Sequence, residues 1–138
     1  MTTNERVKQL QDLTRVGPVQ EIRNLLYETL EARLDTYDYK PGAVPYPFAY
    51  IGEQVNVDEA LKKVVWGRVN TTIHFFHTAM RRADLMALLT LCINDIRSQR
   101  HTEHFYISIR DVSYRVIDES DNGTDIVHAV LDVDIEFQ

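Results

Sequence analysis

The chain switches repeatedly between helical and strand-like patterns, and the order of these segments constrains its fold more than any single motif. Apolar residues recur at helical spacing from Val19 to Leu34 and again from Leu85 to Ile96. Four further segments have strand character, at residues 48–53, 62–77, 105–116 and 127–137. We therefore predict an α+β domain of order α-β-β-α-β-β, in which two helices pack on one face of a mostly antiparallel four-stranded sheet.

Turn signals separate these segments and divide the chain. Gly17-Pro18 ends a weakly amphipathic amino-terminal stretch, and proline suits the first turn of the helix that follows. We predict that residues 1–17 are a short extension, either helical or mobile, and that residues 18–138 form a single domain. The prolines of residues 37–47 exclude a helix there, and residues 52–61, which include several acidic side chains, are predicted to be a loop.

The strand-like segments also predict local detail. In residues 62–77 the odd-numbered positions are the expected core face, and Gly67 is a candidate bulge. The alternation changes phase within the next strand segment, which predicts a bulge or kink near Asp111. Asn122-Gly123 predicts a tight hairpin before the last strand, because both residues tolerate positive φ.

Composition limits the classes of protein to which the chain can belong. Its 138 residues suffice for one domain that buries a core without a disulfide or a metal. The single cysteine, Cys92, lies among apolar residues and is expected to be a buried thiol. The formal net charge of −6 argues against a protein that grips DNA or RNA through a basic surface. No apolar run has the length of a membrane span and no signal peptide is recognisable, so we expect a cytoplasmic, reducing environment.

The sequence contains no convincing catalytic or metal-binding constellation. His74 and His77 would point to opposite faces of one strand, so they cannot share an ion. The segment that begins at Asp118 resembles a calcium loop, but Ala129 occupies the position where a bidentate glutamate is required. We therefore expect no enzyme activity, no cofactor and no bound metal.

Several short motifs occur in an order that resembles one family of assembly proteins. They are Leu25–Leu30, Pro45–Glu53, Thr72–Phe76, Arg115–Asp118 and the charged Asn-Gly hairpin that precedes the last strand. Together they resemble the tail-completion, or tail-terminator, proteins that join head and tail in long-tailed bacteriophages. The resemblance covers about residues 19–137 and leaves the amino-terminal extension outside the pattern.

The resemblance implies a structural role in the tail or neck of a virion that is assembled in the host cytoplasm. Such proteins end the tail tube as a ring, usually of six subunits, and present a surface to the head connector. The implied partners are other copies of the chain, the tail tube protein and the head-connector protein. DNA passes through the ring without specific binding, and no membrane is involved.

We expect two groups of charged residues to contact a neighbouring subunit or partner. The first group lies in or beside the predicted loop and comprises Glu53, Asp58, Glu59, Lys62 and Lys63. The second, called the acidic row below, lies on one face of the last strand and comprises Asp132, Asp134 and Glu136. If the acidic row lined a channel, its charge would repel DNA, which is a hypothesis of the sequence alone.

Two alternatives stay open at the level of sequence. One is a small-molecule-binding or enzymatic α+β domain with a pocket between sheet and helices, lined by Tyr50, Trp66, His74 and Tyr114. Such a domain would have a deep concave pocket with a perturbed acid or base. The other is a different component of the head–tail connector, such as a stopper or adaptor.

Overall fold

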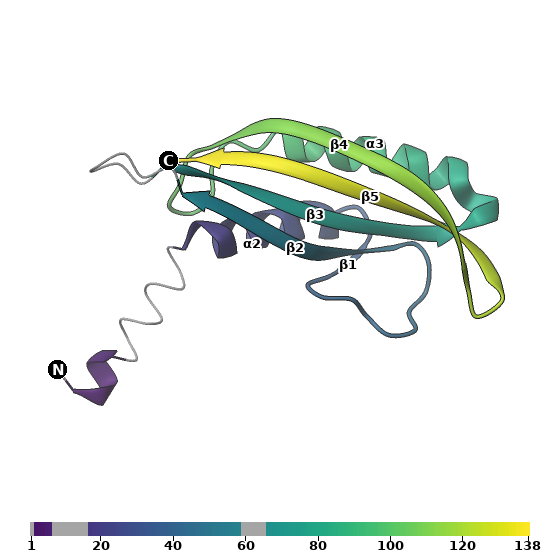
Figure 1. The fold of residues 1–138 in the computed structure, drawn as a ribbon, viewed down its shortest axis with the longest axis horizontal. Coiled ribbons are helices and arrows are strands. Elements are labelled where there is room, and N and C mark those ends of the chain that lie inside the picture. The colour runs from purple at the N-terminus through teal and green to yellow at the C-terminus, as the bar shows by residue number, and fades with distance from the viewer. Residues whose placement is uncertain (1, 7–16, 59–65) are drawn as a thin grey trace.

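A computed structural model describes residues 2–6, 17–58 and 66–138 of the chain. After a helical turn at residues 3–6, the described chain has two long helices and five strands, shown in Figure 1. The elements are α2 (Pro18–Glu31), β1 (Asp35–Tyr37), β2 (Phe48–Asp58), β3 (Gly67–Thr78), the 3-10 turn η1 (Ala79–Arg81), α3 (Arg82–Arg97), β4 (Ile107–Asp121) and β5 (Thr124–Phe137).

The five strands form one mixed sheet in the order β1-β2-β3-β5-β4. Strand β1 pairs in parallel with the start of β2, whereas the three other pairings are antiparallel. The prediction of a four-stranded, mostly antiparallel sheet and of its element order was therefore wrong. Strand β1 escaped prediction because it has three residues, too few to show a period, and because its partner lies beyond a proline-containing connection.

The prediction of a loop at residues 52–61 was also wrong for residues 52–58, which the structure describes. Strand β2 continues to Asp58 and pairs with β3 as far as Gly67. The pairing shifts register between Ile51 and Gln54, and this bulge changes which residues face the helices. The sequence obscured the strand because the bulge interrupts the alternation of side chains that identifies a strand.

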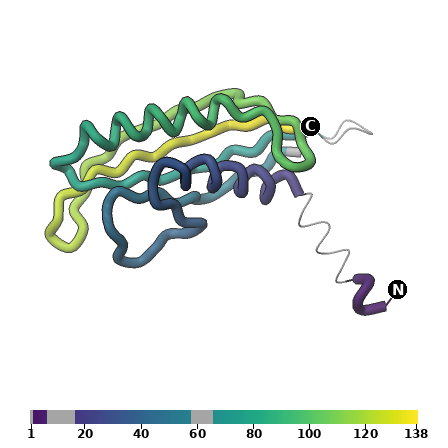
Figure 2. The backbone as a smooth tube through the Cα atoms, turned by 180° about the vertical axis from the view of Figure 1, so that it is seen from behind, coloured from purple at the N-terminus to yellow at the C-terminus, as the bar shows by residue number. Residues whose placement is uncertain are grey.

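Both helices lie on the same side of the sheet, as Figure 2 shows from behind. The predicted helical stripes supply their buried side chains, and α2 and α3 also contact each other. The sheet contributes the odd-numbered residues of β3, which are buried from Gly67 to Phe75 as predicted. The largest fully buried side chains are Phe75, Phe137, Ile22, Leu26, Leu30, Ile51, Ile73, Leu85, Leu89, Ile96, Leu131 and Ile135.

Two predicted irregularities of the chain are confirmed, and a third is wrong. Asn122 and Gly123 have φ angles of 48° and 83°, as a tight hairpin of this kind requires. The register of β4 against β5 shifts between Ile109 and Asp111, where the change of phase predicted a bulge. No bulge occurs at Gly67, which pairs in register with both neighbouring strands.

Arg23 links α2 to the irregular part of β2. Its guanidinium donates hydrogen bonds of 2.8 Å to the backbone oxygens of both Ile51 and Gly52. It also reaches Oε1 of Gln54 at 3.3 Å, and both the carboxylate and the backbone oxygen of Asp38. These carbonyls lie at the bulge, where a regular ladder is interrupted, so Arg23 provides donors that the sheet does not.

A buried carboxylate anchors the loop that leads from α3 to β4. Glu21, in the first turn of α2, has only 5% of its surface exposed. Its carboxylate accepts hydrogen bonds from Thr102 Oγ1 at 2.9 Å and from the backbone N–H of His104 at 2.8 Å. The His104 ring nitrogen Nδ1 lies 3.0 Å from the second carboxylate oxygen. Helix α2 therefore holds both a loop and a strand through polar side chains.

In the described ranges, no helix is long and apolar enough to cross a membrane.

Helix α2 begins at Pro18 after Gly17, which agrees with the predicted start of the helix. Residues 7–16 lie outside the described part, so the division into an extension and a domain stays a prediction.

Candidate functional site

The face of the sheet opposite the helices, called the open face, carries most of the chemically distinctive side chains. Pairing of the strands places alternate residues on it. The open face is formed by Phe48, Tyr50, Val55 and Val57 of β2, by Arg68, Asn70, Thr72, His74 and Phe76 of β3, by Ile126, His128, Val130, Asp132, Asp134 and Glu136 of β5, and by Ser108, Asp111, Ser113, Arg115, Ile117 and Glu119 of β4.

At one end of the open face, each carboxylate of the acidic row has a partner. Thr72 Oγ1 donates to Asp132 at 2.8 Å, and Arg68 lies 3.9 Å from Asp134. Glu136 accepts two hydrogen bonds of 2.8 Å, one from Trp66 Nε1 and one from Arg110 Nη1. The partners come from the two strands that flank β5 and from the residue that precedes β3.

These contacts change the electrostatic character of the acidic row. Three carboxylates face two guanidinium groups, from Arg68 and Arg110, so the local sum is −1 rather than −3. The ion pairs are partly exposed, which screens the remaining charge further. The repulsion of DNA by this surface is therefore weaker than the sequence by itself implies.

At the other end of the open face, aromatic and imidazole rings stack in one cluster. The ring of Tyr50 stacks on His74 with centroids 4.6 Å apart, and Phe76 stacks on His128 at 4.2 Å. Phe48 extends the cluster by stacking on Phe76 at 4.9 Å. Burial of these rings on the face that no helix covers creates a second, smaller apolar cluster.

A chain of hydrogen bonds runs through the two imidazoles of this cluster. His128 Nδ1 lies 2.8 Å from Glu119 Oε1, and His128 Nε2 lies 2.8 Å from His74 Nδ1. A carboxylate can only accept, so His128 carries a hydrogen on Nδ1 and donates it to Glu119. Burial lowers the pKa of His74 below its ordinary value, and the neighbouring His128 ring is a second, smaller cause of the same shift.

The backbone of β2 lies directly against the same cluster. A Cβ atom added to Gly52 would lie 3.0 Å from both His74 Nε2 and the backbone oxygen of Thr72. Only glycine fits this close approach without displacing a neighbour. The bulge that Arg23 supports therefore also sets the position of the His74 ring.

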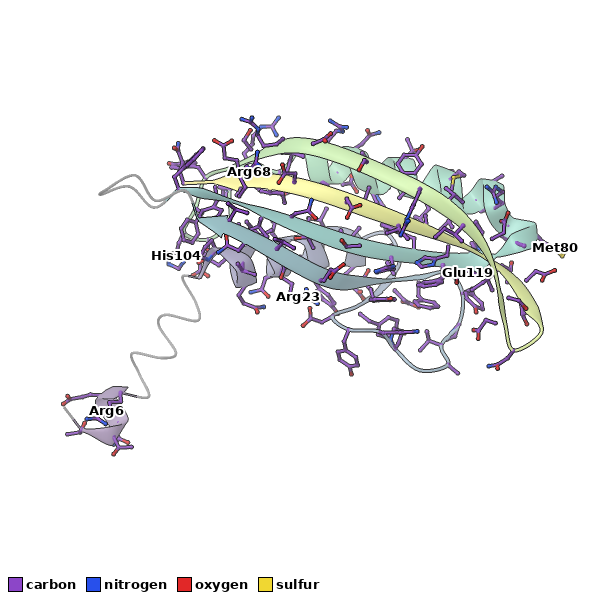
Figure 3. All side chains as sticks on the ribbon, in the orientation of Figure 1. Arg6, Arg23, Arg68, Met80, His104 and Glu119 are labelled. Atoms are coloured by element: carbon purple, nitrogen blue, oxygen red, sulfur yellow. The ribbon has the colours of Figure 1, made fainter. Side chains whose placement is uncertain are left out.

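A recess of about 310 Å³ opens beside the ring cluster, between the β1–β2 connection and the β4–β5 hairpin. Its wall is formed by Lys40, Pro41, Gly42, Tyr46, Phe48, Tyr50, Phe76, Glu119, Ser120, Asp121, Ile126 and His128. Tyr46 donates its hydroxyl to Asp121 Oδ2 at 3.1 Å, which joins the two sides of the recess. In Figure 3, Glu119 lies at this end of the sheet and Arg68 lies toward the opposite end.

The residues predicted as partner contacts do not form one surface. Glu53 is exposed at the bulge of β2, and Asp58 is the last residue of that strand. The acidic row lies on β5, and β3 separates the two strands. Glu59, Lys62 and Lys63 lie outside the described residues. Whether any of them contacts a partner stays a prediction.

The residues of the alternative pocket are not brought together either. Tyr50 and His74 stack on each other, but Trp66 is bonded to Glu136 at the far end of β3. Tyr114 is 55% exposed and lies opposite Leu131, on the helix side of the edge strand. Across the described ranges, no group of three or more histidine, cysteine, aspartate or glutamate side chains could hold a metal ion.

The sequence did not predict the recess or the hydrogen-bonded imidazoles. It placed His74 on the half-exposed face of its strand, which the structure confirms. His128 shares the face of β5 that carries the acidic row, yet only 9% of that residue is exposed. The missing information was the adjacency of β3 and β5, since His74 and His128 are 54 positions apart.

Comparison with known proteins shows a shared fold at low sequence identity. No protein-family model matches the chain, and no curated protein matches its sequence. A chain in the virion of a native gene transfer agent particle matches with a TM-score of 0.53 and 13% identity, over 91% of this chain and 90% of that one. A second solved protein, which carries no descriptive name, matches with a TM-score of 0.55 and 12% identity, over 93% and 95% of the two chains.

Proposed function

We propose that the protein is a structural component of a phage or phage-like virion that caps the tail tube as a ring and joins it to the head connector. The observation that carries this proposal is the shared fold with a chain of the gene transfer agent virion, which extends over nearly the full length of both chains. The order of sequence motifs, which resembles that of tail-terminator proteins, supports the finer assignment to the end of the tail tube.

The two unlike edges of the sheet support a ring. Strand β4 forms one edge along its whole length. At the other edge, β1 pairs only with Phe48–Tyr50, so β2 extends beyond its neighbour from Ile51 to Asp58. The two edges differ, and a contact between them would be heterologous, which is the type of contact that closes a ring. We propose six copies, as the resemblance implies.

The charge of the chain fits a ring through which DNA passes without being held. The formal net charge is −6, and no large basic surface is expected from the composition. The acidic row keeps a net negative sum after its ion pairs are counted. Exchange of Asp132 and Asp134 for lysine would reverse that sum, and unchanged DNA passage and assembly would argue against a role for the row in the channel.

Electron microscopy of the purified protein mixed with the tail tubes of its own particle tests the proposal. We expect rings at one end of each tube, and no further growth of capped tubes when free tube protein is added. If the rings bound the head connector and left the tube ends bare, the protein would instead be a stopper or adaptor. A protein that binds neither tubes nor connector would refute the structural role.

A further inference from the structure

We propose that the recess between the β1–β2 connection and the β4–β5 hairpin binds the guanidinium group of an arginine presented by a partner protein. The recess measures about 310 Å³, which leaves room for one arginine side chain. Its wall combines carboxylates with aromatic rings, the two kinds of group that recognise a guanidinium. This inference concerns the hairpin end of the open face and does not depend on the proposed ring.

In the described ranges, no arginine or lysine lies within salt-bridge distance of the two carboxylates of the recess. Glu119 and Asp121 are two positions apart on β4 and therefore project from the same face of the strand. Glu119 accepts from His128 and Asp121 accepts from Tyr46, both through one carboxylate oxygen. Neither carboxylate forms a salt bridge with an arginine or lysine among the described residues, and each keeps acceptor capacity for a ligand.

Asp118, on the same strand, is a carboxylate that already has an arginine partner. Asp118 projects from the opposite face of β4 and pairs with Arg82 of α3 at 2.7 Å. Arginine thus already neutralises the carboxylate on the helix side of the strand, whereas the two on the recess side accept from His128 and from Tyr46. This difference makes Asp118 a control within the same strand.

The aromatic rings of the recess complete the site for a planar cation. Tyr46, Phe48 and Tyr50 form one wall, and the Tyr46 ring is held by its hydroxyl bond to Asp121. A guanidinium can stack on a ring while its coplanar N–H groups reach carboxylates on either side. An ammonium group is a point charge that cannot do both. The described ranges hold no group of three or more histidine, cysteine, aspartate or glutamate side chains that could bind a metal ion. Lys40, also in the wall, contributes one positive charge against two negative charges.

Nuclear magnetic resonance titration of the full-length protein with N-acetylarginine methylamide tests this inference. N-acetylcitrulline methylamide, which has nearly the same shape and no charge, is the matched probe. We expect saturable shifts at Gly42 and Ser120 with the arginine probe, and about tenfold weaker binding or none with the citrulline probe. Equal binding of both probes, or the absence of saturable shifts from the recess, would overturn the inference.

Three variants locate the interaction. Glu119→Gln keeps an oxygen that can accept from His128, and Asp121→Asn keeps one for Tyr46, so both preserve the local bonds while removing charge. Each is expected to weaken binding of the arginine probe about tenfold. Asp118→Asn, on the other face of the strand, is expected to leave binding unchanged. If Asp118→Asn weakened binding of the arginine probe as much as Glu119→Gln does, the loss would reflect net charge and not a specific site.

Discussion

Substitution of Arg23 by methionine tests how helix α2 stabilises the bulge of β2. Methionine keeps a long apolar stem and a good helix former, but it removes all five hydrogen bonds made by the guanidinium. The critical losses are the two bonds of 2.8 Å to the backbone oxygens of Ile51 and Gly52. Both acceptors are partly buried.

The free energy of unfolding is expected to fall by about 2–4 kcal/mol. A buried acceptor that loses its partner costs about 1–3 kcal/mol, and because these two are only partly buried, about 1–2 kcal/mol is expected for each. The ion pair with Asp38 adds little, because that carboxylate is 57% exposed and solvent screens it to under about 1 kcal/mol. The total is a large share of the roughly 5–15 kcal/mol that stabilises a domain of this size.

Urea unfolding, followed by far-ultraviolet circular dichroism, measures the effect. We expect the midpoint to fall by about 1–2 M with an unchanged slope. Arg33→Met is the matched control, because Arg33 follows the same helix and bonds only the Asp95 carboxylate in an exposed pair. A loss for Arg23→Met below about 1 kcal/mol, or equal to that of the control, would refute the assignment of Arg23 as a structural link.

Three further changes have defined outcomes. Glu21→Ala removes the acceptor for Thr102 and His104 and should cost about 2 kcal/mol, with faster hydrogen exchange of the His104 amide. Cys92 has no exposed surface and burial raises its pKa to about 12, so a thiol reagent should modify it at pH 8 only after unfolding. The pKa of His74 is lowered by burial from 6.5, so the unfolded state binds the proton more readily and stability should fall as the pH drops below about 6.5. His74→Phe should make that decline shallower.

Each of these outcomes can be contradicted by a simple measurement. Unchanged exchange of the His104 amide in Glu21→Ala would show that the loop is held by other contacts. Rapid modification of native Cys92 would show that the core around it opens readily. If the urea midpoint of His74→Phe depended on pH in the same way as that of the parent protein, another group would cause the loss of stability at low pH. His77 is the first candidate, because burial lowers its pKa as well.

Local patterns in the sequence were sufficient to predict most of the secondary structure. The stripes around Ile22 and Leu89 identified α2 and α3, because a helix repeats its buried positions within a few residues. The same holds for the alternation in β3, the hairpin at Asn122 and the bulge near Asp111. All of these features depend on residues that are close in sequence.

Features that depend on distant pairing were missed. Strand β1 has no pattern of its own and exists only because Asp35–Tyr37 pair with Phe48–Tyr50. Arg23 lies outside the apolar stripe of α2, although its side chain is only 16% exposed. Its role depends on the bulge of β2, which lies almost thirty positions further along the chain.

The candidate sites follow the same division. Sequence alone determined that Asp132, Asp134 and Glu136 share one face of a strand, since that follows from the period of two. Only the tertiary structure decided that arginines from β3 and β4 offset this row, and that His74, His128 and Glu119 join beside a recess. Periodicity is a property of one segment, whereas the order and register of strands depend on the packing of the whole chain.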